Sequence, residues 1–223
     1  MLSLTDSWKS AYPNASVGLL QMRGVSNPEA NADLDAKSAY VERALRESYS
    51  GADRAAIKAI PAINAYNDYY KRFKKTYHVQ LQLESVLLKG RSIPGMRSLV
   101  KAMVTAELKN QLLTAGHDVS KLDGLLTASV ATGDEEYVGF GGKPLQLKAN
   151  DMNISDGAGV ISSVLYGPDA RTSLGPETES ACFTVYAVPG IDKAAVEAHL
   201  HDIGEFVRLV APNAAVELLE VFN

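Results

Sequence analysis

The sequence has one cysteine, no long apolar run and no excess of positive charge, and each of these shortages excludes a class of protein. Cys182 alone supplies no disulfide framework and no cysteine-rich metal site among the 223 residues. No stretch approaches the roughly 18 consecutive apolar residues of a membrane-spanning helix. The first residues, MLSLTDSWKSAYPNAS, lack the basic start and apolar core of a signal peptide. We therefore expect a cytoplasmic protein without a membrane partner, a metal or a cofactor.

The charge balance argues against DNA as a partner and leaves RNA open. The formal net charge is −4, so the chain as a whole is not a polycation. One basic segment, YYKRFKKTYH (69–78), interleaves cations with aromatic residues that stack on unpaired bases in other RNA-binding proteins. The candidates for contacts to RNA phosphates are Lys71, Arg72, Lys74 and Lys75. The alternative is an amphipathic helix end, with its aromatic residues inward and its lysines in water.

The chain reads as one domain, 1–223, whose first half (about 1–115) is rich in helix formers and whose second half (about 116–223) is rich in strand candidates. Expected helices lie in 27–51, from 53 onward with a break at Pro61, in 81–90, within 92–116 and in 192–212. Expected strands lie in 15–25, 125–131, 136–142, 145–149, 159–167, 181–190 and 214–222. Helices followed by a turn-rich mixed sheet indicate an α+β fold with the helices packed on one side.

The stretch VTAELKNQLLTAGHD (104–118) raises the question of a site. Its helical pattern ends in what the small residues predict to be a turn at Ala115 and Gly116, and two polar residues, His117 and Asp118, follow at once. We expect this corner to border a water-accessible hollow between helix and sheet.

Three segments resemble a known family. They are LVKAMVTAELKNQLLTAGHDVSKLDG (99–124), GGKPLQLKAND (141–151) and GAGVISSVLYGPDARTSLGPETESACFTVYAVPG (157–190). The pattern resembles the editing domain of the phenylalanyl-tRNA synthetase beta subunit over roughly residues 15–220. It is more similar still to the free-standing bacterial relatives of that domain, one group of which clears tRNA charged with the arginine mimic canavanine. The resemblance implies a three-layer β/β/α fold enclosing a pocket, an aminoacylated tRNA as partner, and ester hydrolysis as the activity.

The alignment of the 99–124 segment departs from the family's pattern. Without gaps, Lys101 takes the place of the family's Asp and Val104 that of its Asn, while Asp118 matches the closing Asp. His117 then falls on an aromatic position. A second register, with a two-residue deletion, instead places Thr105 and His117 on the synthetase's own Thr and His. These departures put a Phe- or Tyr-type specificity in doubt.

Two residues are candidates for the chemistry itself. His117 has an ordinary pKa near 6.5, which suits a group that orients or deprotonates the attacking water; the alternative is a turn histidine that caps backbone groups. Asp118 is a candidate for binding the substrate amine, or else it begins a helix as a cap or an Asx-turn.

Other residues are candidates for binding the substrate: Glu84, Thr105, Glu107, Asn110, Arg171 and Thr172. A carboxylate such as Glu107 suits a cationic amino-acid side chain, whereas an ordinary exposed helix Glu is the alternative. Arg171 suits a phosphate of the tRNA terminus, or else belongs to a surface loop.

The leading hypothesis from the sequence is a trans-editing deacylase that clears a mischarged aminoacyl-tRNA. A synthetase pocket cannot strongly reject a near-isostere, and separate hydrolysis solves that problem. An arginine-like amino acid such as canavanine is the expected substrate, because acidic residues lie near the expected pocket. Two alternatives stay open: a non-catalytic module that binds tRNA or a ligand, and an esterase acting on small aminoacyl esters.

Overall fold

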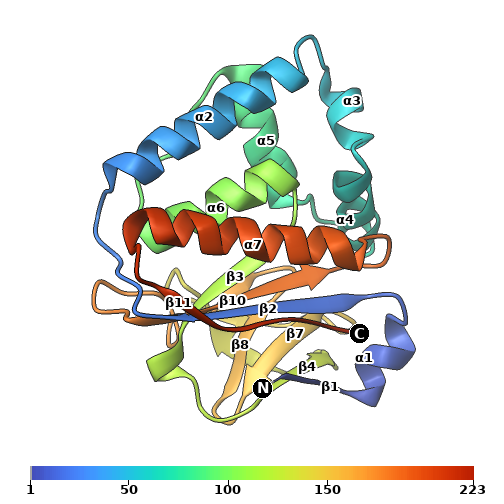
Figure 1. The fold of residues 1–223 in the computed structure, drawn as a ribbon. Coiled ribbons are helices and arrows are strands. Elements are labelled where there is room, and N and C mark those ends of the chain that lie inside the picture. Colours follow the sequence, from blue (N-terminus) through green and yellow to red (C-terminus); the bar gives the residue numbers. More distant parts are fainter. Residues whose placement is uncertain (1) are drawn as a thin grey trace.

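Residues 2–223, the part of the chain that the computed structural model describes, fold into three layers (Figure 1). Helices cover one face of a four-stranded sheet, and a five-stranded sheet lies against its other face. This arrangement confirms the α+β class and the three-layer order that the sequence and the resemblance imply. No helix in this part of the chain is long and apolar enough to cross a bilayer.

Apart from the short first helix, the helices form where the apolar periodicity predicts them, and Pro61 separates two of them. Pro61 is the first residue of its helix, where its fixed backbone angle fits and its missing N–H has no partner to lose. Asn31 caps α2 by accepting a hydrogen bond from the Leu34 N–H. The helices are α1 (Asp6–Ala11), α2 (Ala32–Ser48), α3 (Arg54–Lys58), α4 (Pro61–Lys71), α5 (His78–Lys89), α6 (Ser98–Asn110) and α7 (Lys193–Val210), with a short 3-10 turn η1 (Val119–Lys121).

The four-stranded sheet is antiparallel and forms the middle layer. Its order is β11 (Ala215–Phe222), β2 (Ser16–Arg23), β10 (Ser180–Ala187) and β3 (Thr114–Asp118). Strands β2 and β10 read as continuous apolar runs because helices cover one face and the second sheet covers the other. Helix α7 approaches β2 closely at Gly18, where an added Cβ would lie 2.5 Å from the Val196 Cγ1.

The five-stranded sheet is mixed, because β1 and β4 are parallel and the other pairs are antiparallel. Its order is β1 (Leu2–Leu4), β4 (Leu126–Val130), β7 (Met152–Asp156), β8 (Gly159–Ser163) and β9 (Gly167–Pro168). A separate two-stranded ribbon pairs β5 (Glu136–Val138) with β6 (Pro144–Gln146). One apolar core joins the helices and both large sheets.

The prediction of a turn at Ala115 and Gly116 is wrong, because these residues lie in the buried strand β3. Helix α6 ends earlier, at Asn110, and is capped by Gln111, whose φ of 56° is left-handed. The chain then pairs with β10, and Gly116 lies opposite Phe183. An added Cβ on Gly116 would lie 2.8 Å from the Leu174 Cδ1, so the small residue reflects close packing and not a turn.

We predict that Tyr66→Phe lowers the free energy of unfolding by about 2 kcal/mol, because it leaves two buried backbone groups without a partner. The Tyr66 hydroxyl donates to the Tyr186 carbonyl at 2.6 Å and accepts from the Leu113 N–H at 3.0 Å. It thereby ties α4 to β10 and to the start of β3. Urea unfolding measures the change. The control is Tyr40→Phe, at an exposed tyrosine, where less than about 0.5 kcal/mol is expected; equal losses in the two variants would refute the argument.

Candidate active site

A hollow with a volume of about 120 Å³ lies beside Gly116, between α6 and the edge of the middle sheet. Its walls are almost wholly apolar, and Ser173 is the one lining side chain with a hydroxyl. Phe140 is 71% exposed and forms part of the rim. At about 30 Å³ for each small group, the hollow holds about four non-hydrogen atoms. The lining residues are Val100, Met103, Gly116, Phe140, Pro168, Ser173 and Leu174.

Side-chain alternation along β3 decides what reaches this hollow. Gly116 faces α6, where an added Cβ would lie 3.4 Å from the Met103 sulfur. Successive strand residues point to opposite faces, so His117 points away from α6 and contacts Thr172 instead. Neither His117 nor Asp118 lines the hollow. The expected corner therefore has a hollow, but the polar residues that follow it are turned elsewhere.

His117 is fully buried in a chain of hydrogen bonds. Its Nδ1 lies 2.7 Å from the Thr172 hydroxyl, which in turn donates to the Asp169 carboxylate. Because that hydroxyl proton goes to Asp169, the Nδ1 of His117 is the donor. Burial lowers the pKa of His117 to about 3, with Asp156 opposing that effect. The imidazole is neutral at cellular pH, and it holds the 169–172 turn in place.

Asp118 is engaged by its own turn. Its Oδ1 accepts from the Ser120 N–H at 3.0 Å and from the Ser120 hydroxyl at 2.7 Å, and its Oδ2 accepts from Thr178 at 2.8 Å. Burial alone would raise the pKa of Asp118, but these hydrogen bonds and the charge of Lys121 outweigh it and lower the pKa. This geometry is the Asx-turn alternative, at the start of η1.

The three candidates on α6 lie within the helical layer. The buried Glu107 accepts a hydrogen bond from the Thr114 N–H at 2.8 Å, and burial raises its pKa to about 8. Thr105 lies 2.7 Å from the Ser38 hydroxyl. Asn110 donates to Asp202 at 2.8 Å. All three connect α6 to neighbouring elements, and none lines the hollow.

The remaining substrate-binding candidates have partners of opposite charge or hydrogen-bond partners. Glu84 forms a salt bridge with Arg54 at 2.8 Å. The hydrogen bond from Arg54 is the main cause of the lowered pKa of the Glu84 carboxyl. Arg171 pairs with Asp156 at 2.8 Å. Thr172 is buried between His117 and Asp169. The structure brings Arg171, Thr172 and His117 together, but around the 169–172 turn, where Arg171 is exposed, and not around the hollow.

The basic segment 69–78 has its aromatic residues inward, as the amphipathic alternative expects: Tyr69, Tyr70, Phe73 and Tyr77 are buried. Its cations differ in their surroundings. Lys71 pairs with Asp68 at 3.4 Å, and the Lys75 ammonium lies 4.0 Å from the centre of the Tyr166 ring. Arg72 and Lys74 line a groove. Because the tyrosine rings of this segment are buried, RNA bases cannot stack on them.

Sequence reasoning missed most of the hollow, because Val100, Met103, Pro168 and Leu174 carry no polar signal and are typical of core positions. Gly116 was the one lining residue with a signal. Among residues 2–223, no group of three or more His, Cys, Asp or Glu side chains is placed to hold a metal ion.

Comparison with known proteins identifies a fold but no family. No protein-family model matches the chain, and no curated protein matches it. An N-terminal fragment of the phenylalanyl-tRNA synthetase beta subunit from Pyrococcus horikoshii has a similar structure, with a TM-score of 0.50 at 10% sequence identity. The match covers 97% of this chain and 50% of that fragment, so the chain spans half the length of this neighbour. The likeness shows a shared fold over nearly the whole chain.

Proposed function

We propose that this protein hydrolyses the ester of a mischarged aminoacyl-tRNA in trans, and that the hollow beside Gly116 receives the amino-acid side chain. The observation that carries the proposal is the hollow itself, which lies at the end of the 99–118 segment, where the sequence resembles tRNA-editing domains. The fold shared with the synthetase fragment supports it.

The walls of the hollow favour a small uncharged amino-acid side chain. None of the lining residues is charged, and the space suits about four non-hydrogen atoms. A buried cation without a partner is costly, so an arginine-like side chain fits poorly here. The acidic residues that motivated canavanine, Glu84 and Glu107, have partners elsewhere and do not line this space.

The chemistry needs little from the protein beyond positioning. Water attacks the ester carbonyl carbon, the bond to the ribose oxygen breaks, and that oxygen takes a proton, releasing the amino acid and the tRNA. The neighbouring ribose hydroxyl is close enough to assist. Ser173 donates its own proton to the Ala170 carbonyl at 2.9 Å, so its oxygen is left to accept a hydrogen bond from the substrate ammonium.

His117 acts in this proposal as a positioning residue. The Asp118 N–H donates to the Thr172 carbonyl at 2.7 Å, and His117 donates to the Thr172 hydroxyl. These bonds fix the backbone directly before Ser173 and Leu174, which line the hollow. A side chain held by its neighbours keeps the binding groups in place without contacting substrate.

We expect the purified protein to accelerate ester loss from tRNA charged with a small uncharged amino acid. The measurement follows hydrolysis of tRNA charged separately with alanine, serine, valine, tyrosine, arginine or canavanine, against protein-free controls. One methylene more or less in such a pocket changes the rate by about 10- to 200-fold, so one of the small substrates should stand out. Hydrolysis no faster than in the protein-free control on every substrate would refute the proposal. Hydrolysis of only the canavanine and arginine esters would show that the hollow does not bind the amino-acid side chain.

A non-catalytic tRNA-binding module is the second candidate, favoured by the lack of a charged group among the lining residues. It predicts that charged tRNA binds and keeps its ester. An esterase for small aminoacyl esters would instead hydrolyse free amino-acid esters as fast as charged tRNA, so including a free ester in the same assay separates the three readings.

A further inference from the structure

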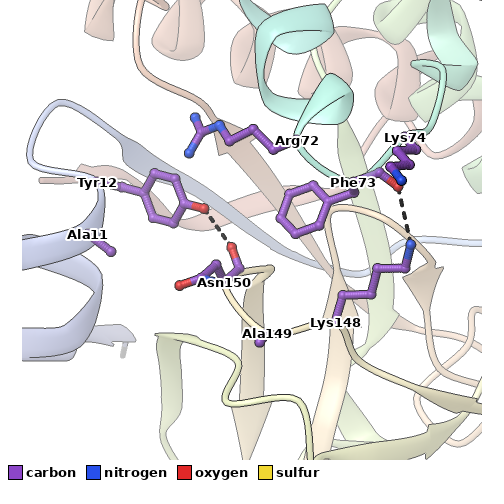
Figure 2. Close-up of a pocket in the computed structure, with 8 residues that line it drawn as sticks. All are labelled: Ala11, Tyr12, Arg72, Phe73, Lys74, Lys148, Ala149 and Asn150. Carbon is purple, nitrogen blue, oxygen red and sulfur yellow. Dashed lines mark hydrogen bonds between the residues drawn. The ribbon is translucent and has the colours of Figure 1, made fainter.

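A second, more open groove lies between the end of α1, the end of α4 and the loop that precedes β7 (Figure 2). Its volume is about 700 Å³, far larger than the hollow beside Gly116. Figure 2 shows that three cationic side chains, from two separate parts of the chain, lie around it. The lining residues are Ala11, Tyr12, Arg72, Phe73, Lys74, Lys148, Ala149 and Asn150.

The three cations of this groove have no carboxylate partner. Arg72, Lys74 and Lys148 are exposed, and within residues 2–223 none of them lies within salt-bridge distance of an acid. Lys148 donates one hydrogen bond to the Phe73 carbonyl at 3.2 Å and keeps its other donors. Arg54 and Arg171, elsewhere in the fold, are by contrast each paired with a carboxylate.

The Arg72 guanidinium is held by aromatic rings instead of an acid. It lies 5.2 Å from the centre of the Tyr12 ring and 5.3 Å from that of Tyr69. Tyr12 is itself fixed, because its hydroxyl donates to the Asn150 carbonyl at 2.5 Å (Figure 2). Stacking occupies the face of the guanidinium and leaves its in-plane N–H groups for an anion such as phosphate.

A fourth cation, Lys75, adds to the positive charge. Its pKa is lowered first by burial and then by the charge of Lys148, which places the two lysines within electrostatic reach. Asp151, which directly follows the lining residue Asn150, is fully buried and accepts a hydrogen bond from the Tyr69 hydroxyl at 2.7 Å. Several positive charges close together repel one another, which destabilises the folded protein when no ligand is bound. An anionic ligand reduces this repulsion.

We propose that this groove binds the phosphate backbone of RNA through Arg72, Lys74 and Lys148. The proposed function enters only in the choice of tRNA as the RNA. Consecutive phosphates each carry one charge, so a run of them matches several unpaired cations in an open groove better than a single small anion does. Tyr12 is 3% exposed and Phe73 is 8% exposed. Little ring surface is left for stacking on bases, so the contact is to the backbone and independent of sequence.

The test compares two triple variants that remove the same charge. The groove variant is R72Q/K74Q/K148Q, and the control is K58Q/K89Q/R91Q, at exposed cations of α3, α5 and the loop after it. Binding of uncharged tRNA is measured by fluorescence anisotropy from low to high salt. Each lost phosphate contact lowers the slope of log K against log salt by about 0.7 to 0.9. We expect a slope smaller by about two and binding on the order of 100-fold weaker near 0.1 M salt, with little change in the control.

Equal weakening in both triple variants would overturn the proposal, and so would ATP or inorganic phosphate binding to the groove as tightly as tRNA. Thermal unfolding checks the fold of each variant. If the triple variant is unfolded, the single variants K74Q and K148Q serve, each with an expected loss of about 0.7 in slope. Uncharged tRNA has no ester, so the result is independent of deacylation. A protein that binds through this groove without any turnover would leave this inference standing and refute the proposed function.

Discussion

Replacing Val100 by phenylalanine is expected to lower kcat/KM for the preferred aminoacyl-tRNA on the order of 100-fold, the effect of displacing a reacting group by about 1 Å. Val100 lies on α6 and lines the hollow. The phenylalanine side chain has four more carbon atoms than that of valine, and the space holds about four, so the acyl side chain is excluded. The fold is expected to tolerate the change, because filling a hollow adds apolar contacts.

The matched control is Val104→Phe, the same substitution one helical turn later. Val104 lines a different hollow of about 140 Å³, together with Val86 and Ile93. Deacylation rates of the two variants, measured on the substrate that the wild-type protein prefers, separate the two spaces. Full activity in Val100→Phe, or equal loss in both variants, would show that the hollow beside Gly116 does not receive the substrate.

The wild-type protein is expected to lose stability as pH rises, because Glu107 is buried. Replacing Glu107 by glutamine is expected to prevent this loss. Burial raises the pKa of Glu107 from 4.5 to about 8 in the folded state. Between these two pH values the folded protein keeps a proton that the unfolded chain has released. The free energy of unfolding is therefore unaffected by Glu107 below pH 4.5 and falls as pH rises from 4.5 toward 8. A shift of this size corresponds to about 5 kcal/mol, of which about 4 kcal/mol is lost between pH 5 and pH 9. Glutamine retains an acceptor for the Thr114 N–H and does not titrate.

The measurement is urea unfolding of both proteins at intervals from pH 5 to pH 9. We expect similar stabilities at pH 5 and a Gln variant more stable by about 4 kcal/mol at pH 9. His117 and His199, whose pKa values burial lowers to about 3, destabilise the fold as pH falls below 6.5; they are common to both proteins and cancel in the difference. The control is Glu205→Gln, at an exposed glutamate of α7. Parallel pH curves for wild type and Glu107→Gln would refute the argument.

Local patterns predicted most of the elements, and their failures have local causes. The apolar stripes of α6 and α7 and the continuous runs of β2 and β10 are long enough for periodicity to identify them. Strand β1 has three residues and helix α1 has six, which is too short for such a pattern, and both were missed. Strand β7 was missed as well; its five residues, MNISD, alternate only partly.

The sequence predicted where the hollow lies but not which residues line it. The corner beside Gly116 does hold a hollow, and the resemblance to editing domains drew attention to it. The sequence directed attention to polar residues, however, and His117, Asp118 and Glu107 are each held by hydrogen bonds away from the hollow. A polar side chain near a site in sequence either faces it or supports it, and strand alternation with the partners across the fold decides which.

What the amino-acid sequence determined by itself is the α+β class, the order of most helices and strands, and the presence of a basic segment near 69–78, because these depend on periodicity and composition within short stretches. What only the tertiary structure decided is which groups are free to act. The pairing of Glu84 with Arg54 depends on contacts between residues far apart in the chain, and so does the lack of a carboxylate partner, within residues 2–223, for Arg72 and Lys148. Burial and charge pairing depend on those contacts, and no local pattern records them.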